Sequence, residues 1–351
     1  VVVNCAGRTR SIIGAQSLIN AGIANRVAAL KDGTMGWHLA GLPLEKGADR
    51  HAPDPSPEAL AKAQAAAARV AARVGVRSID AAGLAQWQRE ADRRTLFLLD
   101  VRSPEEYAAG HLPGSRSAPG GQLVQATDEY VGVRNARLVL IDDTGVRATM
   151  TASWLIQMGW PEVVVLRDGL AGDLETGAER PGANVSEAAD HPKIDAAALN
   201  EAGLNGTVVV DFADSLTYRA GHIPGAWFMV RSRIAADVKN LPRAERYVAT
   251  SQDGRLARLA APELAAATGR SVTVLRGGTA AWRAAELLLV QGHENLASEP
   301  DDVVYKPYDH EGGIEDYMRE YLAWERELVA QIEADGTANF RILTPEERPG
   351  G

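Results

Sequence analysis

The chain contains one cysteine, Cys5, and the residues around it are of the kinds that make a thiol reactive. Cys5 follows the apolar run Val1–Val3 and lies in a short loop that continues through Gly7, Arg8 and Arg10. Only the thiolate form of cysteine is a strong nucleophile, and nearby cations and unpaired backbone N–H groups favour that form. The pattern therefore predicts a nucleophilic thiolate at Cys5.

Two elements must position this thiol. The apolar run predicts a strand that ends just before Cys5, and residues 11–20 predict a helix that begins just after the loop. Unpaired N–H groups at the start of that helix can surround a sulfur anion, and Gly7 lets the loop curl without a steric clash. A buried small hydrophobic residue is the alternative interpretation of a lone cysteine after valines. The arginines and the repeats described next favour the nucleophile.

The strand–loop–helix arrangement occurs three times along the chain. Each copy combines a short apolar strand, a polar loop with glycine and the start of a helical pattern, at residues 2–10, 139–147 and 248–256. Each copy is followed by a second strand and a glycine turn, at residues 29–33, 165–169 and 274–278. Trp37 and Trp282 come four residues after this turn in the first and third copies, and we interpret them as packing anchors.

A second block precedes only the second and third copies. It runs from a strand with Asp100 or Asp211 to a Gly-His-x-Pro-Gly turn with His111 or His222, at an interval of 11 residues in both cases. We interpret the aspartates, with Arg102, as braces within their own domains, and the histidines as turn and packing residues. The first copy lacks this block, and roughly 45 residues bury the two faces of a sheet poorly. We therefore expect an upstream segment in the native protein.

Strands that alternate with helices of this length predict α/β domains in tandem, each with a small parallel sheet flanked by helices. We expect the C-terminal half of one domain in residues 1–46, and complete domains in residues 76–180 and 190–295.

The remaining segments predict connecting and docking helices. Residues 47–75 predict a linker with an alanine-rich helix, which Ser56 caps and Gly75 stops. Residues 296–351 predict an extension with an amphipathic helix that ends near Gly336. We interpret its apolar side as a docking face for a neighbouring unit or subunit, which also allows a homo-oligomer.

The composition excludes several classes of protein. The chain of 351 residues is 46% hydrophobic with a formal net charge of −9, which argues against nucleic acid as the main partner. No apolar run approaches the length of about 18 residues that a membrane span needs. One cysteine excludes an intramolecular disulfide framework and fits a reducing compartment, so we expect the cytoplasm. The seven histidines lack metal-ligand spacing, and we predict no metal.

Four motifs of the chain, taken together, are specific enough to indicate a family. They are Asp-Val-Arg at 100–102, Glu-Tyr-x-x-Gly-His-Leu-Pro-Gly at 106–114, a strand ending in Cys-x-x-x-x-Arg at 5–10, and Gly-x-x-x-Trp at 33–37. The set resembles the rhodanese (sulfurtransferase) family, and the chain is similar to its multi-domain members with tandem repeats. No motif that we can name covers the last part of the chain.

The resemblance implies one active loop and two degenerate ones. It implies that Cys5 is the nucleophile and that the rest of the active loop binds substrate, namely Ala6, Gly7, Arg8, Thr9 and Arg10. Arg8 would face the incoming anion, and Arg10 would close the loop. Asp142 and Ser251 stand at the cysteine position of the other two loops and cannot hold a persulfide. The second loop keeps the closing arginine as Arg147, whereas the third has Leu256 there.

The implied reaction moves sulfane sulfur in two steps without a cofactor. The Cys5 thiolate takes the outer sulfur of a small anionic donor such as thiosulfate, and cyanide or a thiol then accepts it from the Cys5 persulfide. A non-catalytic binding or scaffold protein is the first alternative. A phosphatase or arsenate reductase on the same fold is the second, although such relatives have one more residue between cysteine and arginine than Cys5 and Arg10 have.

The two degenerate loops allow other interpretations. Asp142 and Asp143 could form an acid pair or an ion site, but adjacent side chains point apart and a solvated loop is favoured. Ser251 lacks a recognisable histidine or aspartate partner, so we do not expect a serine nucleophile.

Overall fold

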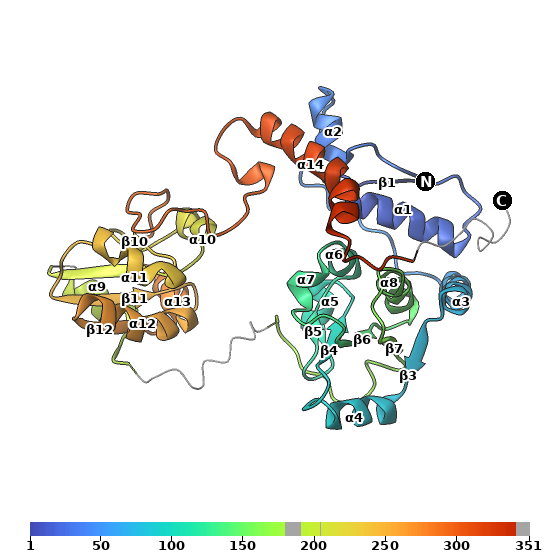
Figure 1. Cartoon of the computed structure of the whole chain (residues 1–351), viewed down its shortest axis with the longest axis horizontal. Coiled ribbons are helices and arrows are strands. Elements are labelled where there is room, and N and C mark those ends of the chain that lie inside the picture. Colours follow the sequence, from blue (N-terminus) through green and yellow to red (C-terminus); the bar gives the residue numbers. More distant parts are fainter. Residues whose placement is uncertain (180–190, 204, 342–351) are drawn as a thin grey trace. The chain divides into compact units, whose positions relative to one another are not determined.

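The computed structural model describes residues 1–179, 191–203 and 205–341. The chain divides into two compact units, which we describe separately. Unit 1 combines residues 1–180 with residues 313–351, and unit 2 is the intervening part of the chain. Each unit contains strands and helices in alternation (Figure 1).

Unit 1 contains a five-stranded parallel sheet in the order β3-β7-β6-β4-β5. Its strands are β3 (Arg77–Ile79), β4 (Leu96–Asp100), β5 (Arg116–Ser117), β6 (Arg137–Ile141) and β7 (Val163–Leu166). Its helices are α4 (Ala81–Arg89), α5 (Pro104–Ala109), α6 (Gly120–Gln125), α7 (Thr127–Tyr130) and α8 (Val146–Gln157). Residues 138–141 of the central strand β6 are completely buried, because helices cover both faces of a parallel sheet and its strands are apolar throughout.

Unit 2 repeats this topology in the order β8-β12-β11-β9-β10, again with parallel pairing. Its strands are β8 (Lys193–Ile194), β9 (Thr207–Asp211), β10 (Trp227–Phe228), β11 (Arg246–Thr250) and β12 (Ser271–Leu275). Its helices are α9 (Ala196–Ala202), α10 (Ser215–Ala220), α11 (Ile234–Asp237), α12 (Arg255–Thr268) and α13 (Gly278–Ala284). Both sheets confirm the predicted α/β class.

The first 46 residues form part of unit 1 and reproduce only the second half of such a sheet. They contain β1 (Val2–Val3), α1 (Thr9–Ala21), β2 (Ala28–Ala29) and α2 (Gly33–Leu39). β1 and β2 pair in parallel, with Val2 opposite Ala28. The helix begins two residues earlier than the sequence predicts. This β1-α1-β2 segment corresponds to β6-α8-β7 and β11-α12-β12 in the complete domains.

The linker helix α3 (Pro57–Val74) joins this fragment to the complete domain of unit 1. Ser56 caps it by accepting from the N–H of Ala59 at 3.2 Å, and Gly75 ends it in a left-handed conformation. Its buried side includes Ala67 and Val70 and contacts both α1 and α8. The helix therefore begins after Ser56 and ends at Gly75 as the sequence predicts.

The C-terminal helix α14 (Ile314–Asp335) also docks within unit 1. Its buried Met318 and Leu322 form a small apolar cluster with Met35 of α2, and Ala6 and Leu39 pack against that cluster. Figure 1 shows α14 beside α1 and α2. Part of the predicted docking face thus packs, and the surface it covers is the fragment that carries Cys5.

The histidines of the two Gly-His-x-Pro-Gly turns are structural, as predicted. The Nδ1 atom of His111 lies 2.8 Å from the carbonyl of Tyr107, and its ring stacks on that tyrosine. His222 repeats both contacts with Tyr218.

The two tryptophans differ, so the packing prediction holds only in part. Trp282 is buried, and its indole donates to the carbonyl of Leu288. Trp37 is 40% exposed and donates to the carbonyl of Pro43. Trp37 therefore fixes a turn more than it fills a core.

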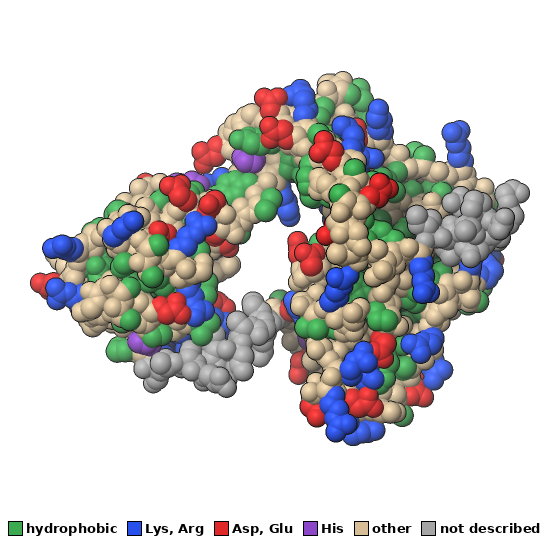
Figure 2. Space-filling model, in the orientation of Figure 1, with side chains coloured by type: hydrophobic (Ala, Val, Ile, Leu, Met, Phe, Trp, Pro, Cys, Tyr) green, Lys and Arg blue, Asp and Glu red, His purple; other side chains and the backbone are tan. Residues whose placement is uncertain are grey.

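Charged side chains of both signs are interspersed on the face of the molecule shown in Figure 2. Among the residues that the structure describes, no helix combines the length and apolar character needed to cross a membrane.

Candidate active site

Cys5 lies in the loop between β1 and α1, and its side chain is half-buried. The start of α2 holds this loop through its backbone. The N–H of Thr34 donates to the carbonyl of Cys5, and the N–H of Met35 donates to that of Ala6, both at 2.9 Å. The second strand of the fragment and its glycine turn therefore fix where the thiol stands.

Gly33 makes that backbone contact possible. Its φ is +60°, and a Cβ atom there would lie 2.3 Å from the carbonyl oxygens of Cys5 and Gly7. Gly278 repeats the arrangement in unit 2, where a Cβ atom would lie 2.0 Å from the carbonyl oxygen of Ser251. Any other residue would push the turn away from the loop. Two of the three glycine turns seen in the sequence thus support their loops, namely those at Gly33 and Gly278.

The second loop holds an anion of its own. The carboxylate of Asp142 accepts from the N–H groups of Gly145 at 2.7 Å, Arg147 at 2.8 Å and Ala148 at 3.2 Å. The expectation of a solvated loop is wrong for Asp142, which is buried, and right for the exposed Asp143. Burial raises the pKa of Asp142, against the lowering effect of these three N–H groups. The backbone of this loop thus forms a cradle for one negatively charged group at the cysteine position.

The third loop holds a neutral side chain at the same position. The hydroxyl of Ser251 is buried and accepts from the N–H of Ala257 at 3.2 Å. This N–H is equivalent to that of Ala148 in the second loop.

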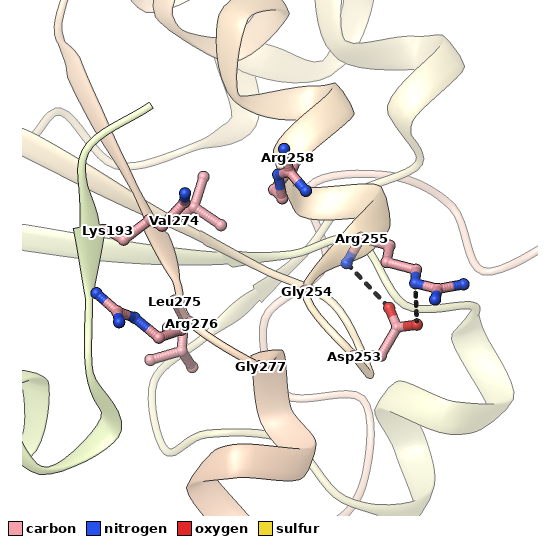
Figure 3. A pocket seen from close by; sticks show the side chains of 9 residues that line it. All are labelled: Lys193, Asp253, Gly254, Arg255, Arg258, Val274, Leu275, Arg276 and Gly277. Carbon is pink, nitrogen blue, oxygen red and sulfur yellow. Dashed lines mark hydrogen bonds and ion pairs between the residues drawn. The ribbon is translucent and has the colours of Figure 1, made fainter. Parts of the chain in front are cut away.

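A basic pocket of about 470 Å³ lies beside the third loop. Figure 3 shows its cationic side chains, Lys193, Arg258 and Arg276, together with Arg255, which pairs with Asp253. Ser251 does not line this pocket.

Arg147 closes the second loop in the way that the family resemblance implies. Its guanidinium donates to Glu106 at 2.7 and 2.9 Å and to Asp143 at 2.8 Å. These bonds lower the pKa of Glu106 to about 2. Glu106 belongs to the first half of its domain, so the closing arginine ties the two halves of that domain together.

The arginines of the Cys5 loop have different surroundings. Arg8 lies 3.6 Å from Asp32, which also pairs with Arg326 of α14 at 2.9 Å. The guanidinium of Arg10 makes no hydrogen bond or ion pair with any residue that the structure describes. The anion-facing role of Arg8 and the closing role of Arg10 stay predictions.

Glu325 of α14 is the functional candidate that sequence reasoning missed. Its carboxylate accepts from the N–H of Arg8 at 3.0 Å, the N–H of Thr9 at 3.4 Å and the hydroxyl of Thr9 at 2.7 Å. The side chain is only 7% exposed. Glu325 therefore caps the N-terminus of α1 from a distant part of the chain.

Gly7 is not needed for the curl of the loop, which is the role that the sequence predicts. It is not among the residues with positive φ, so the curl of the loop does not require glycine. A Cβ atom there would instead lie 2.7 Å from Glu325 Oε2 and 3.1 Å from the ring of Tyr321. The absence of a side chain at Gly7 thus lets α14 reach the loop.

Known proteins share this architecture. A model of the rhodanese-like domain matches residues 80–175 and 195–285, which together make up more than half of the chain. The chain belongs to the rhodanese family. The two matched segments are the complete domains, and the Cys5 fragment lies outside them.

A solved structure matches almost the whole chain. The crystal structure of a thiosulfate sulfurtransferase from Pseudomonas aeruginosa is 49% identical with a TM-score of 0.89, and the match covers 98% of this chain. The chain spans 65% of the length of that protein.

Two curated relatives match shorter segments. A sulfurtransferase from Allochromatium vinosum is 30% identical over 95 residues, which are 27% of this chain and 85% of the relative. A thiosulfate sulfurtransferase from Pseudoalteromonas translucida is 24% identical over 86 residues, which are 24% of this chain and 80% of the relative.

The first and second rhodanese loops differ in which carboxylate accepts a hydrogen bond from the N–H three residues after the cysteine position. In the second loop this N–H belongs to Gly145 and donates to Asp142, whereas in the first it belongs to Arg8 and donates to Glu325. The only sequence signal for Glu325 was its place on an amphipathic helix, where a glutamate is usually solvent-exposed.

Proposed function

We propose that this chain is a sulfurtransferase that carries sulfane sulfur as a persulfide on Cys5. The observation that carries the proposal is the anion cradle of the sister loop, in which Asp142 accepts three backbone N–H groups. Cys5 occupies the same position of a loop with the same length, which likewise lies between a strand and a helix. A thiolate or persulfide anion at Cys5 would be stabilised by the same kind of backbone donors.

The proposed reaction is a double displacement at sulfur. The Cys5 thiolate attacks the outer sulfur of thiosulfate, a new S–S bond forms, and the S–S bond of the donor breaks with its electron pair leaving on sulfite. Cyanide or a thiolate then attacks the outer sulfur of the persulfide. That bond breaks with its pair returning to Cys5, so the thiolate is regenerated and no external oxidant or reductant is needed.

The donor, the acceptor and the location are part of the proposal. Arg8 and Arg10 favour a small anionic donor such as thiosulfate, which also appears in the names of two of the similar proteins. A reducing compartment keeps a free thiol reduced, and the proposal therefore includes a cytoplasmic location. The second and third domains would be non-catalytic, because Asp142 and Ser251 replace the nucleophile.

A direct assay tests the proposal. Incubation with thiosulfate should add the mass of one sulfur atom to the peptide that contains Cys5, and cyanide should remove it as thiocyanate. The Cys5→Ala variant should lose essentially all thiocyanate formation, because the reaction has no other nucleophile. Ser251→Ala is the matched control and should retain full activity. Activity that survives in Cys5→Ala would refute the proposal, and phosphate release from an aryl phosphate would favour the phosphatase alternative.

A further inference from the structure

The Cys5 loop already contains an internal carboxylate. Glu325 takes the N–H groups of Arg8 and Thr9 and the hydroxyl of Thr9, at 3.0, 3.4 and 2.7 Å. These three donors stand at the N-terminus of α1, where an anionic ligand would otherwise bind. A negative charge that is 93% removed from solvent thus lies within the loop that must receive the sulfur donor.

Neighbouring contacts hold Glu325 in place. Arg326, the next residue of α14, pairs with Asp32, which in turn lies 3.6 Å from Arg8. Leu322, one turn earlier on α14, is buried against Met35. Glu325 is therefore fixed by ionic contacts on one side and apolar contacts on the other, and it is not a mobile surface side chain.

The same contacts reduce the positive charge of the loop. Arg8 shares Asp32 with Arg326, and Glu325 covers the backbone donors of Arg8 and Thr9. Arg10 is left as the loop cation without a hydrogen-bond or ion-pair partner among the described residues. One uncompensated cation suits a donor with one negative charge better than a donor with two.

We propose that Glu325 sets the donor selectivity of the Cys5 loop, disfavouring dianionic sulfur donors relative to monoanionic ones. The inference rests on the sulfurtransferase function proposed above and refines its substrate class. Its physical basis is repulsion between the Glu325 carboxylate and the second negative charge of a donor such as thiosulfate, in a site with little solvent to screen it. Thiosulfate stays a substrate, but Glu325 lowers its kcat/KM relative to that of a monoanionic thiosulfonate.

Two donors that differ by one charge provide the test. Thiosulfate and methanethiosulfonate both transfer their outer sulfur to a thiolate, and they release sulfite and methanesulfinate respectively. We would measure kcat/KM for each donor with cyanide as acceptor. The comparison uses the full chain, Glu325→Gln and Glu327→Gln. Glu327 is an exposed residue two positions further along α14, on the opposite side of the helix, so its variant removes the same charge away from the loop.

The expected result is a change in the ratio of the two rates. Glu325→Gln should raise kcat/KM for thiosulfate relative to methanethiosulfonate by on the order of tenfold, and Glu327→Gln should leave the ratio unchanged. Glu325→Met, which removes the charge without adding an amide, should change the ratio in the same direction.

The contrary outcomes separate this inference from the function on which it rests. An equal loss of kcat/KM for both donors in Glu325→Gln would make the residue a structural support only and would overturn the selectivity proposal. An unchanged ratio would overturn it too. Absence of a Cys5 persulfide with either donor in the unmodified chain would overturn the sulfurtransferase proposal itself, and this inference with it.

Discussion

Asp100 and Asp211 occupy the same position in the two complete domains, and one arginine makes the difference between their surroundings. Asp100 is buried and receives the guanidinium of Arg102 at 3.0 and 2.6 Å. Asp211 is equally buried but has Ala213 in place of that arginine. Within the described part of the chain, it accepts only from the N–H of Ala213 at 2.9 Å and the hydroxyl of Thr279 at 3.4 Å. Burial without a cation raises the pKa of Asp211 to about 6 from its ordinary 3.8.

This raised pKa predicts how unit 2 responds to pH. Because the carboxyl binds its proton more tightly in the folded state, its contribution to stability is full below about pH 4 and is lost as pH rises to about 6. Asp211→Asn removes the ionisable group and should raise the free energy of unfolding at pH 7.5 by about 1–3 kcal/mol. Urea unfolding at pH 4 and 7.5 measures the change. Hydrogen exchange in peptides from residues 207–250 reports the unfolding of unit 2.

The equivalent substitution in unit 1 is the control. Asp100→Asn leaves Arg102 buried without its anion and should destabilise that unit by about 3–5 kcal/mol. The account of Asp211 would be wrong if Asp211→Asn left the difference in stability between the two pH values unaltered.

At the scale of elements, α14 is the helix on which the Cys5 loop depends. Met318 and Leu322 are buried against α2, and Glu325 and Arg326 bond to the loop and to Asp32. The apolar contacts and the polar contacts come from one side of one helix. Undocking α14 would therefore expose the loop and remove the cap of α1 at the same time.

Leu322→Ala tests this dependence. The cavity should cost about 2–3 kcal/mol of docking free energy, because Leu322 is 2% exposed in a small cluster. Hydrogen exchange of α14 should accelerate, and alkylation of Cys5 by iodoacetamide should become faster as the covering helix opens. Val329→Ala is the control, since Val329 is 66% exposed on the same helix and should change neither rate. Unchanged exchange in Leu322→Ala would show that α14 is held by other contacts.

At the scale of the whole molecule, each unit has its own sheet and its own core. The core of unit 2 gathers around Phe228, Tyr247 and Leu264, and that of unit 1 around Leu138 and Leu155. Separate cores stabilise units independently when few contacts cross between them.

Calorimetry should therefore resolve two unfolding transitions. Asp211→Asn should move only the transition of unit 2, and Leu322→Ala should move only that of unit 1. A single transition that both substitutions shift would contradict this independence.

Much of this protein follows from its sequence, because the signals involved are local. Buried parallel strands are continuous apolar runs, helices begin and end at residues such as Ser56 and Gly75, and repeats preserve both patterns. The sequence thereby determined the α/β class, the three related loops and Cys5 as the sole thiol among them. It also located the helix that docks.

Tertiary structure alone decided what surrounds those residues. Glu325 reaches the N–H of Arg8 from 317 positions away, and no local pattern encodes such a contact. The same contact explains Gly7, which leaves room for α14. The burial of Asp142 likewise depends on the folded loop, whose N–H groups surround its carboxylate. Periodicity and spacing specify elements and their faces. The partner that a polar group finds depends on how those elements pack, and here packing placed a carboxylate in the loop of the proposed nucleophile.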